Sequence, residues 1–174
     1  MAVLSRYPLG QVVELTGQLW RDLPGADPWF VSPEAAAVQR VSSVAHWDVP
    51  VQTPSGPLHL LALSATPPVF DGQEDRNGRR AEDELRVWQL YLEGRLGGPP
   101  DGPAVVLGNL NVDPVDGEGR REVLKALLNG PLVDPAPRGP GGEAEADPEH
   151  AGDPARGTVA WEGPGNLRVD YVLP

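Results

Sequence analysis

Residues 103–111 read Pro103-Ala104-Val105-Val106-Leu107-Gly108-Asn109-Leu110-Asn111, and this stretch decides the fold class. The apolar run between the proline and Asn109 predicts a strand that is buried on both faces. Polar side chains follow directly at the carboxyl end of this strand, which is a usual place for a site in α/β domains. We therefore expect a central strand at 104–108, with candidate functional groups just after it.

Other strands are predicted on both sides of this one. Residues 58–63 form an apolar run, and residues 47–51 can pair with it across the turn at 53–56. The stretches 2–4 and 167–173 also have strand character. Each lies at an end of the sequence, and we expect each to be an interior strand that is cut off there.

Helices are predicted between the strands. The apolar spacing within 81–93 and 118–129 is typical of amphipathic helices, and Ser32 is a suitable N-cap for a short helix at 33–40. Residues 135–157 are rich in Pro, Gly and acidic residues, which predicts a mobile loop. Strands that are separated by helices indicate one layered α/β domain spanning 1–174.

Composition limits the classes of function. The chain has 174 residues, 21 Gly, 21 Pro, no Cys and a formal net charge of −11. Such an acidic surface repels nucleic-acid phosphates, although a bound divalent cation can reverse the local field for a small phosphoester. The absence of Cys excludes thiolate metal sites, and no apolar run reaches the ~20 residues that span a bilayer.

Two candidate segments follow predicted buried strands. Asn109, Asn111 and Asp113 could face a cation with their side-chain oxygens, but an Asx-rich turn explains the same spacing. Ser64 could be a nucleophile, yet no histidine base is recognisable near it. The three histidines, which have no motif around them, are expected to be ordinary surface or strand residues: His46, His59 and His150.

Two further segments carry charged groups. Arg76, Asn77 and Arg79 could bind a phosphate, although the segment 74–84 also reads as a charged loop that leads into an acidic first helical turn. Asp170 lies within an apolar strand, where a carboxylate is costly unless it is paired. It is either a satisfied core carboxylate or a group that orients a catalytic imidazole.

Taken in order, these segments resemble the endonuclease/exonuclease/phosphatase superfamily, and look closest to a bacterial, often exported branch. The resemblance covers almost the whole chain and is carried by five stretches: Ala2–Pro8, His46–Pro50, Thr66–Gly72 with Glu74–Gly78, Gly108–Asn111 and Arg168–Tyr171. It implies a DNase I-like four-layer αββα sandwich and in-line attack of water on phosphorus with the help of Mg²⁺ or Mn²⁺. The sequence has no recognisable signal peptide of its own.

The resemblance carries over to four positions. Asn111 matches the Asn that holds the phosphoryl group, and Asp170 matches the Asp that orients a histidine. Ser64 stands where the family has a phosphate-contacting His, and Asn109 stands where it has the water-activating Asp. An Asn amide cannot take a proton from water near neutral pH, so this substitution alone predicts a severe loss of rate.

The remaining catalytic groups of the family would precede Met1 or follow Pro174. The resemblance therefore implies a sandwich that is incomplete at both ends, with unpaired strand edges that favour self-association. We expect a degenerate or truncated phosphoesterase with little or no hydrolase activity. Two alternatives stay open: an active metal-dependent phosphoesterase that is completed by another chain or a longer reading frame, and a non-catalytic anion-binding module.

Overall fold

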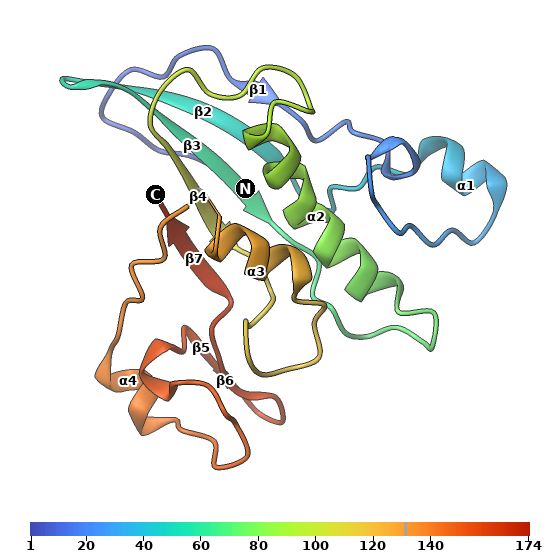
Figure 1. Ribbon diagram of the computed structural model, residues 1–174, viewed down its shortest axis with the longest axis vertical. Coiled ribbons are helices and arrows are strands. Elements are labelled where there is room, and N and C mark those ends of the chain that lie inside the picture. Colours follow the sequence, from blue (N-terminus) through green and yellow to red (C-terminus); the bar gives the residue numbers. More distant parts are fainter. Residues whose placement is uncertain (131) are drawn as a thin grey trace.

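The computed structural model describes residues 1–130 and 132–174 and shows a mixed α/β fold (Figure 1). Its elements in chain order are β1 (Val13–Glu14), η1 (Trp20–Asp22), α1 (Pro33–Val38), β2 (His46–Thr53), β3 (Gly56–Ser64), α2 (Arg76–Leu92), β4 (Ala104–Asn109), α3 (Glu122–Leu128), α4 (Pro140–Ala144), η2 (Pro154–Arg156), β5 (Val159–Trp161), β6 (Gly165–Leu167) and β7 (Asp170–Leu173).

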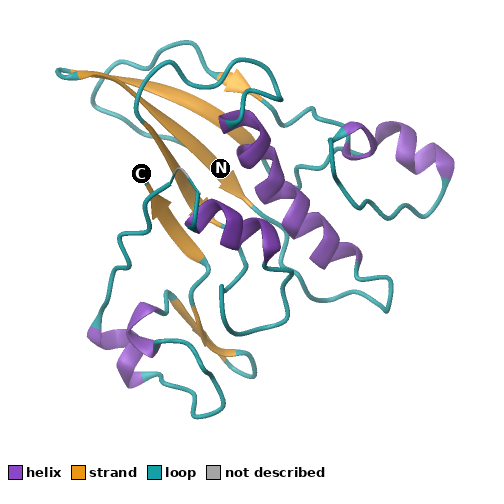
Figure 2. Ribbon diagram, in the orientation of Figure 1, coloured by secondary structure: helices purple, strands orange, loops and turns teal. Residues whose placement is uncertain are grey.

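The main sheet has five strands in the order β1-β2-β3-β4-β7 (Figure 2). β3 and β4 are parallel, and α2 connects them as a crossover helix, whereas the other neighbouring strands are antiparallel. β5 and β6 form a separate two-stranded hairpin. This topology brings the ends of β3 and β4 and the start of β7 to one edge of the sheet.

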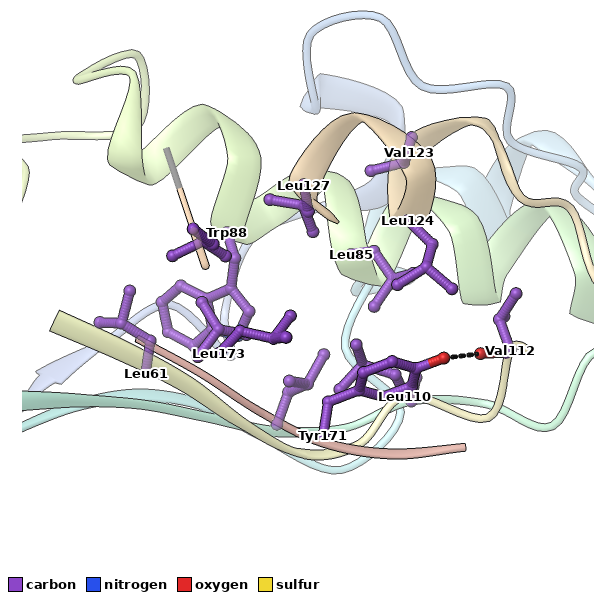
Figure 3. Close-up of a cluster of buried hydrophobic side chains, with 14 of the residues drawn as sticks. Leu61, Leu85, Trp88, Leu110, Val112, Val123, Leu124, Leu127, Tyr171 and Leu173 are labelled. Carbon is purple, nitrogen blue, oxygen red and sulfur yellow. Dashed lines mark hydrogen bonds between the residues drawn. The ribbon is translucent and has the colours of Figure 1, made fainter. Parts of the chain in front are cut away.

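The core lies between the main sheet and the two longest helices, α2 and α3 (Figure 3). β3 contributes Leu61 and Leu63, and β7 contributes Tyr171 and Leu173. These side chains meet an apolar stripe of both helices, namely Leu85, Trp88, Val123, Leu124 and Leu127. Burial of such side chains contributes about 1.5–3 kcal/mol each, so this layer holds the sheet edge in place.

The predicted strands at 47–51, 58–63 and 104–108 are confirmed as β2, β3 and β4. Two helices differ in extent from the prediction. α2 begins at Arg76, five residues before the predicted start at 81, after Asp75 in the left-handed conformation. α3 begins at Glu122 rather than at 118, and Arg121 is its N-cap.

Two predictions about strands at the ends of the sequence were wrong. Residues 2–4 form no strand, and Leu4 is 97% exposed. The stretch 167–173 is not one strand, because β6 ends at Leu167 and β7 begins at Asp170. Between them Arg168 N donates to Asp113 Oδ2 at 2.7 Å and Val169 N donates to Thr158 Oγ1 at 2.9 Å, so side chains replace the ladder there.

The segment 135–157 contains α4 and η2. Asn166 Nδ2 donates to Gly142 O at 2.7 Å and to Pro154 O at 2.9 Å, which ties both short elements to β6. The mobility of this segment stays a prediction. Throughout 1–130 and 132–174, no helix combines the length and the apolar character needed to cross a membrane.

Candidate functional site at the edge of the main sheet

Three of the predicted site residues lie side by side on neighbouring strands. Ser64 ends β3 and is the register partner of Asn109 in β4, and Asn109 is the register partner of Asp170 in β7. We call Ser64, Asn109 and Asp170 the edge row. Because the two parallel strands end together and β7 begins there, residues that are far apart in the sequence share one edge.

Asn109 and Asp170 are bonded to each other within the edge row. Asn109 Nδ2 donates to Asp170 Oδ1 at 3.0 Å. Asp170 also receives a backbone link, since its N–H donates to Thr158 Oγ1 at 3.1 Å. Asp170 is therefore an exposed carboxylate paired with a neutral amide, and not the buried core carboxylate that was one of the two readings of the sequence.

Gly108 allows this close approach. Its φ is +134°, and a Cβ at this position would lie 2.0 Å from Leu63 O. Any side chain would push β4 away from β3 just before the edge row. The next turn is equally constrained, because Asn111 adopts a φ of +55° and its Nδ2 donates to Ala65 O at 2.6 Å.

The fourth predicted residue, Asn111, thus donates a hydrogen bond from its side-chain amide to the backbone just after β3. Ala65 N in turn donates to Asn109 O at 2.9 Å. Together these bonds fasten the chain that follows β3 to the chain that follows β4. The arrangement leaves hydroxyl and amide groups and one carboxylate at the edge, which can form hydrogen bonds but supply little negative charge.

The proposed substrate-binding residues lie at the start of α2 and make internal bonds. Asn77 Nδ2 donates to Val69 O at 2.7 Å, and its backbone N–H donates to Asp71. Arg79 Nε donates to Glu74 O at 2.9 Å, and its guanidinium pairs with Asp27. The structure brings Arg76 into the same first turn of α2, where its buried Nε has no partner among the described residues.

Asp113, the remaining oxygen donor after β4, organises its own turn. Its Oδ1 accepts from Val115 N at 2.7 Å and from Asp116 N at 2.8 Å, and its Oδ2 accepts from Arg168 N. Its side chain therefore makes the Asx-rich turn that was the alternative to a cation site.

The stretch Arg168–Tyr171 has structural partners that the sequence did not reveal. Arg168 is 3% exposed and forms a bidentate pair with Asp134, at 2.7 and 2.8 Å. The Arg168 guanidinium holds the pKa of Asp134 well below its usual range. It also lies over the Tyr171 ring, 4.4 Å from the centroid, and Tyr171 OH donates to Val112 O at 3.0 Å. These contacts position β7 beside β4.

Glu84 is a second anchor that the sequence did not reveal. Its buried carboxylate accepts from Ser43 N at 2.5 Å, Ser43 Oγ at 2.6 Å and Thr66 N at 2.5 Å. Burial raises its pKa despite these donors. The carboxylate thus fixes the segment that follows Ser64. The sequence signal was weak, because Glu84 stands in a run of acidic residues that is typical of an exposed helix.

The three histidines have structural partners. His46 Nε2 donates to Glu84 O at 2.8 Å, and burial lowers the pKa of His46 to about 4. His59 Nδ1 lies 2.8 Å from Asp48 Oδ1. His150 Nδ1 donates to Asn166 O at 3.1 Å. Among the described residues, no hydrogen bond joins any of the three to Ser64.

The donor set at the edge row does not fit a divalent cation by itself. Hard cations such as Mg²⁺ prefer carboxylate oxygens, and the edge row has one carboxylate, which already bonds to Asn109. Within the described residues, no group of three or more His, Asp or Glu side chains could hold a metal ion.

Comparison with known proteins identifies one family for this chain. The profile of the Endonuclease/Exonuclease/phosphatase family matches residues 1–174, and the chain belongs to this family, whose members generally depend on divalent metals. No curated protein matches the chain. Its similarities are instead to solved structures.

One similar structure is an endonuclease/exonuclease/phosphatase from Beutenbergia cavernae DSM 12333, with 19% identity and a TM-score of 0.55; the match covers 97% of this chain and 38% of that one. Another is SmcL, with 11% identity and a TM-score of 0.53, covering 97% of this chain and 50% of that one. These similarities confirm the DNase I-like α/β fold. They also agree with the expectation that residues 1–174 hold part of the sandwich.

Proposed function

We propose that residues 1–174 form a phosphoesterase-fold protein that has little or no hydrolase activity of its own. The observation that carries this proposal is the bond between Asn109 Nδ2 and Asp170 Oδ1. The family resemblance implies a water-activating Asp at position 109 and a histidine-orienting Asp at position 170. In this chain position 109 carries an amide instead of a carboxylate, and this amide is hydrogen-bonded to the Asp170 carboxylate.

The chemistry of the edge row supports the proposal. An amide cannot act as a general base near neutral pH, and loss of a general base lowers the rate by about 10²–10⁴-fold. Ser64 supplies a hydroxyl where the family has an imidazole, so a cationic contact to phosphate is lost as well. A reacting phosphoryl group would meet few charges that stabilise the transition state.

A second candidate is an active divalent-metal phosphoesterase whose further catalytic groups lie outside residues 1–174, in another chain or a longer reading frame. It is favoured by the extent of the match, since this chain covers 38% and 50% of the two solved chains. A non-catalytic anion-binding role has less support, because Asn77 and Arg79 make internal bonds.

The test is hydrolysis of bis(4-nitrophenyl) phosphate by the purified 174-residue chain with Mg²⁺ or Mn²⁺. We expect release of nitrophenol that equals a no-protein blank. The matched control is Asp170→Asn, which keeps the shape of the edge row and removes its charge. Chelator-sensitive hydrolysis that is lost in Asp170→Asn would contradict the proposal, because the edge row would then be catalytic.

A further inference from the structure

A broad groove lies beside the edge row and is not explained by the hydrolase fold. It has a volume of about 880 Å³ and is formed by three segments and His150. The segments are the loop Pro67–Phe70, the loop Asn111–Gly119 and the β5–β6 hairpin with its turn. Binding sites for organic ligands commonly enclose about 300–1,000 Å³, so the groove has room for one. Figure 1 shows the hairpin below the main sheet and the loop that follows β4 next to it.

The groove is lined mainly by apolar side chains. Leu167 is 6% exposed, and Pro68 lies against Gly119, where an added Cβ would come within 3.3 Å of Pro68 Cγ. Two aromatic residues also line the groove. Phe70 is 91% exposed and has a φ of +68°, and Trp161 is 43% exposed. A bulky residue with positive φ is unusual, and exposed apolar surface around a hollow is typical of an interaction site.

Apart from His150, the ionisable side chains of the groove are all acidic. Among its described lining residues there is no Lys or Arg, whereas four carboxylates are present. Two of them are engaged: Asp113 holds its own turn, and Asp116 accepts from Ala151 N and Gly152 N at 2.9 and 2.8 Å. The other two, Glu118 and Glu162, are exposed and form no ion pair within the described part of the chain.

This combination selects the ligand class. Uncompensated carboxylates attract a cation and repel a phosphate or carboxylate, and a net charge of −11 strengthens both effects. Aromatic faces also attract organic cations. A small inorganic ion would not cover the apolar side chains of the groove, which would stay exposed to water. An ammonium group on an extended apolar body satisfies both parts of the groove.

We propose that this groove binds an organic ammonium ion with an extended apolar body, with the ammonium group near Glu118 and Glu162 and the body against Phe70, Trp161 and Leu167. The proposal does not depend on hydrolase activity, because none of these side chains belongs to the edge row. Asn111 lines the groove and also fastens the site edge, so the two regions adjoin.

The test uses three probes of equal length and different charge: 4-phenylbutylammonium, 4-phenylbutan-1-ol and 4-phenylbutanoate. Binding to the full chain is measured by isothermal titration calorimetry at 150 mM salt. We expect the ammonium probe to bind about threefold to tenfold more tightly than the alcohol, since exposed charge pairs contribute modestly to affinity. The carboxylate probe should bind more weakly than the alcohol.

Variants separate the groove from the general charge of the protein. Glu118→Gln with Glu162→Gln should lower the affinity for the ammonium probe to that for the alcohol. The matched control, Glu143→Gln with Glu145→Gln, makes the same change of net charge in or next to α4 and should alter nothing. Phe70→Ala with Trp161→Ala should lower the affinity for the ammonium probe and the affinity for the alcohol to a similar extent. All six side chains are exposed, so we expect the variants to fold.

Three results would overturn the proposal. The first is equal binding of the three probes, because charge would then play no part. The second is an equal loss of affinity in the two glutamate pairs, which would show a long-range field rather than a local site. The third is unchanged binding after Phe70→Ala with Trp161→Ala, which would place the probe elsewhere.

Discussion

Asn109 Nδ2 donates a hydrogen bond to Asp170 Oδ1 over 3.0 Å, across the register pair that joins β4 to β7. This bond gives the carboxylate a neutral partner. A second carboxylate at position 109 would instead face Asp170 at hydrogen-bonding distance. The Asn109–Asp170 pair therefore determines the charge of the edge row and how the fold responds to substitutions there.

Asn109→Asp should destabilise the fold at neutral pH. Like charges that lie directly opposite each other on neighbouring strands are unfavourable, and we expect a loss of about 1 kcal/mol at pH 7. The loss should shrink as the pH falls toward 4, because one proton can then be shared by the two carboxyl groups. Urea unfolding at both pH values measures this, with Asn109→Ala as the control. A pH-independent difference would show that the two side chains do not interact.

His46 should make the fold less stable in mild acid. Burial lowers the pKa of His46 to about 4, against about 6.5 in the unfolded chain. Below pH 6.5 the unfolded state takes up the proton first, so stability is lost as the pH falls from about 6.5 toward 4. The loss should reach about 2 kcal/mol by pH 5.

Other groups pack around His46, and one of them opposes this trend. Ser42 Oγ is hydrogen-bonded to His46 Nδ1, and the centroid of a Trp88 ring lies 5.2 Å from that of the imidazole. Burial raises the pKa of Glu84, whose backbone carbonyl accepts from His46. A raised carboxyl pKa favours the folded state at low pH, so Glu84 offsets part of the loss. Unfolding free energies at pH 5 and 7.5 test the assignment. His46→Gln should flatten the difference, and an unchanged pH slope in this variant would rule His46 out as its source.

Arg168→Lys should be costly although the charge is kept. A lysine cannot reproduce the bidentate pair with Asp134 or the stack on Tyr171. We expect a loss of about 2–3 kcal/mol in the free energy of unfolding. Arg138→Lys is the control, since the Arg138–Asp153 pair lies at the surface and should change stability by less than about 1 kcal/mol. Equal losses in the two variants would contradict a structural role for Arg168.

Limited proteolysis should cut the chain first within 135–157. The segment is acidic, rich in Gly and Pro, and exposed from Glu143 to Ala146. Mass spectrometry of early fragments locates the cut. First cleavage within 81–93 instead would show that the mobile segment has been misplaced, because that part of α2 packs in the core.

The sequence predicted the elements whose signals are local. The apolar runs of β3 and β4 and the amphipathic spacing of α2 were enough to place the site edge, and the turn at 53–56 predicted the β2–β3 pairing. The stretch 2–4 has the same apolar character as a strand but has no strand partner in the structure. Strand formation depends on pairing, which composition alone does not contain.

The site could be predicted only in part for the same reason. The positions of Ser64, Asn109 and Asp170 followed from the strands and from the family resemblance. The partners of Arg168 and Glu84 did not, because Asp134 lies in an irregular segment and Ser43 lies in a loop far away in the sequence. Long-range hydrogen bonds between polar groups leave no periodic signal in the sequence.

The proposed loss of hydrolase activity is tested most directly by metal-dependent hydrolysis by the double variant Ser64→His with Asn109→Asp, beside the unmodified chain. The variant returns an imidazole and a carboxylate to the edge row beside Asp170, but it does not return the remaining metal-binding group that the family resemblance implies. Without an anchored cation, charge that develops on the phosphoryl oxygens has no preorganised partner. We expect nitrophenol release at the level of the blank for both proteins, with Mg²⁺ or Mn²⁺. Chelator-sensitive turnover by the unmodified 174-residue chain would contradict it.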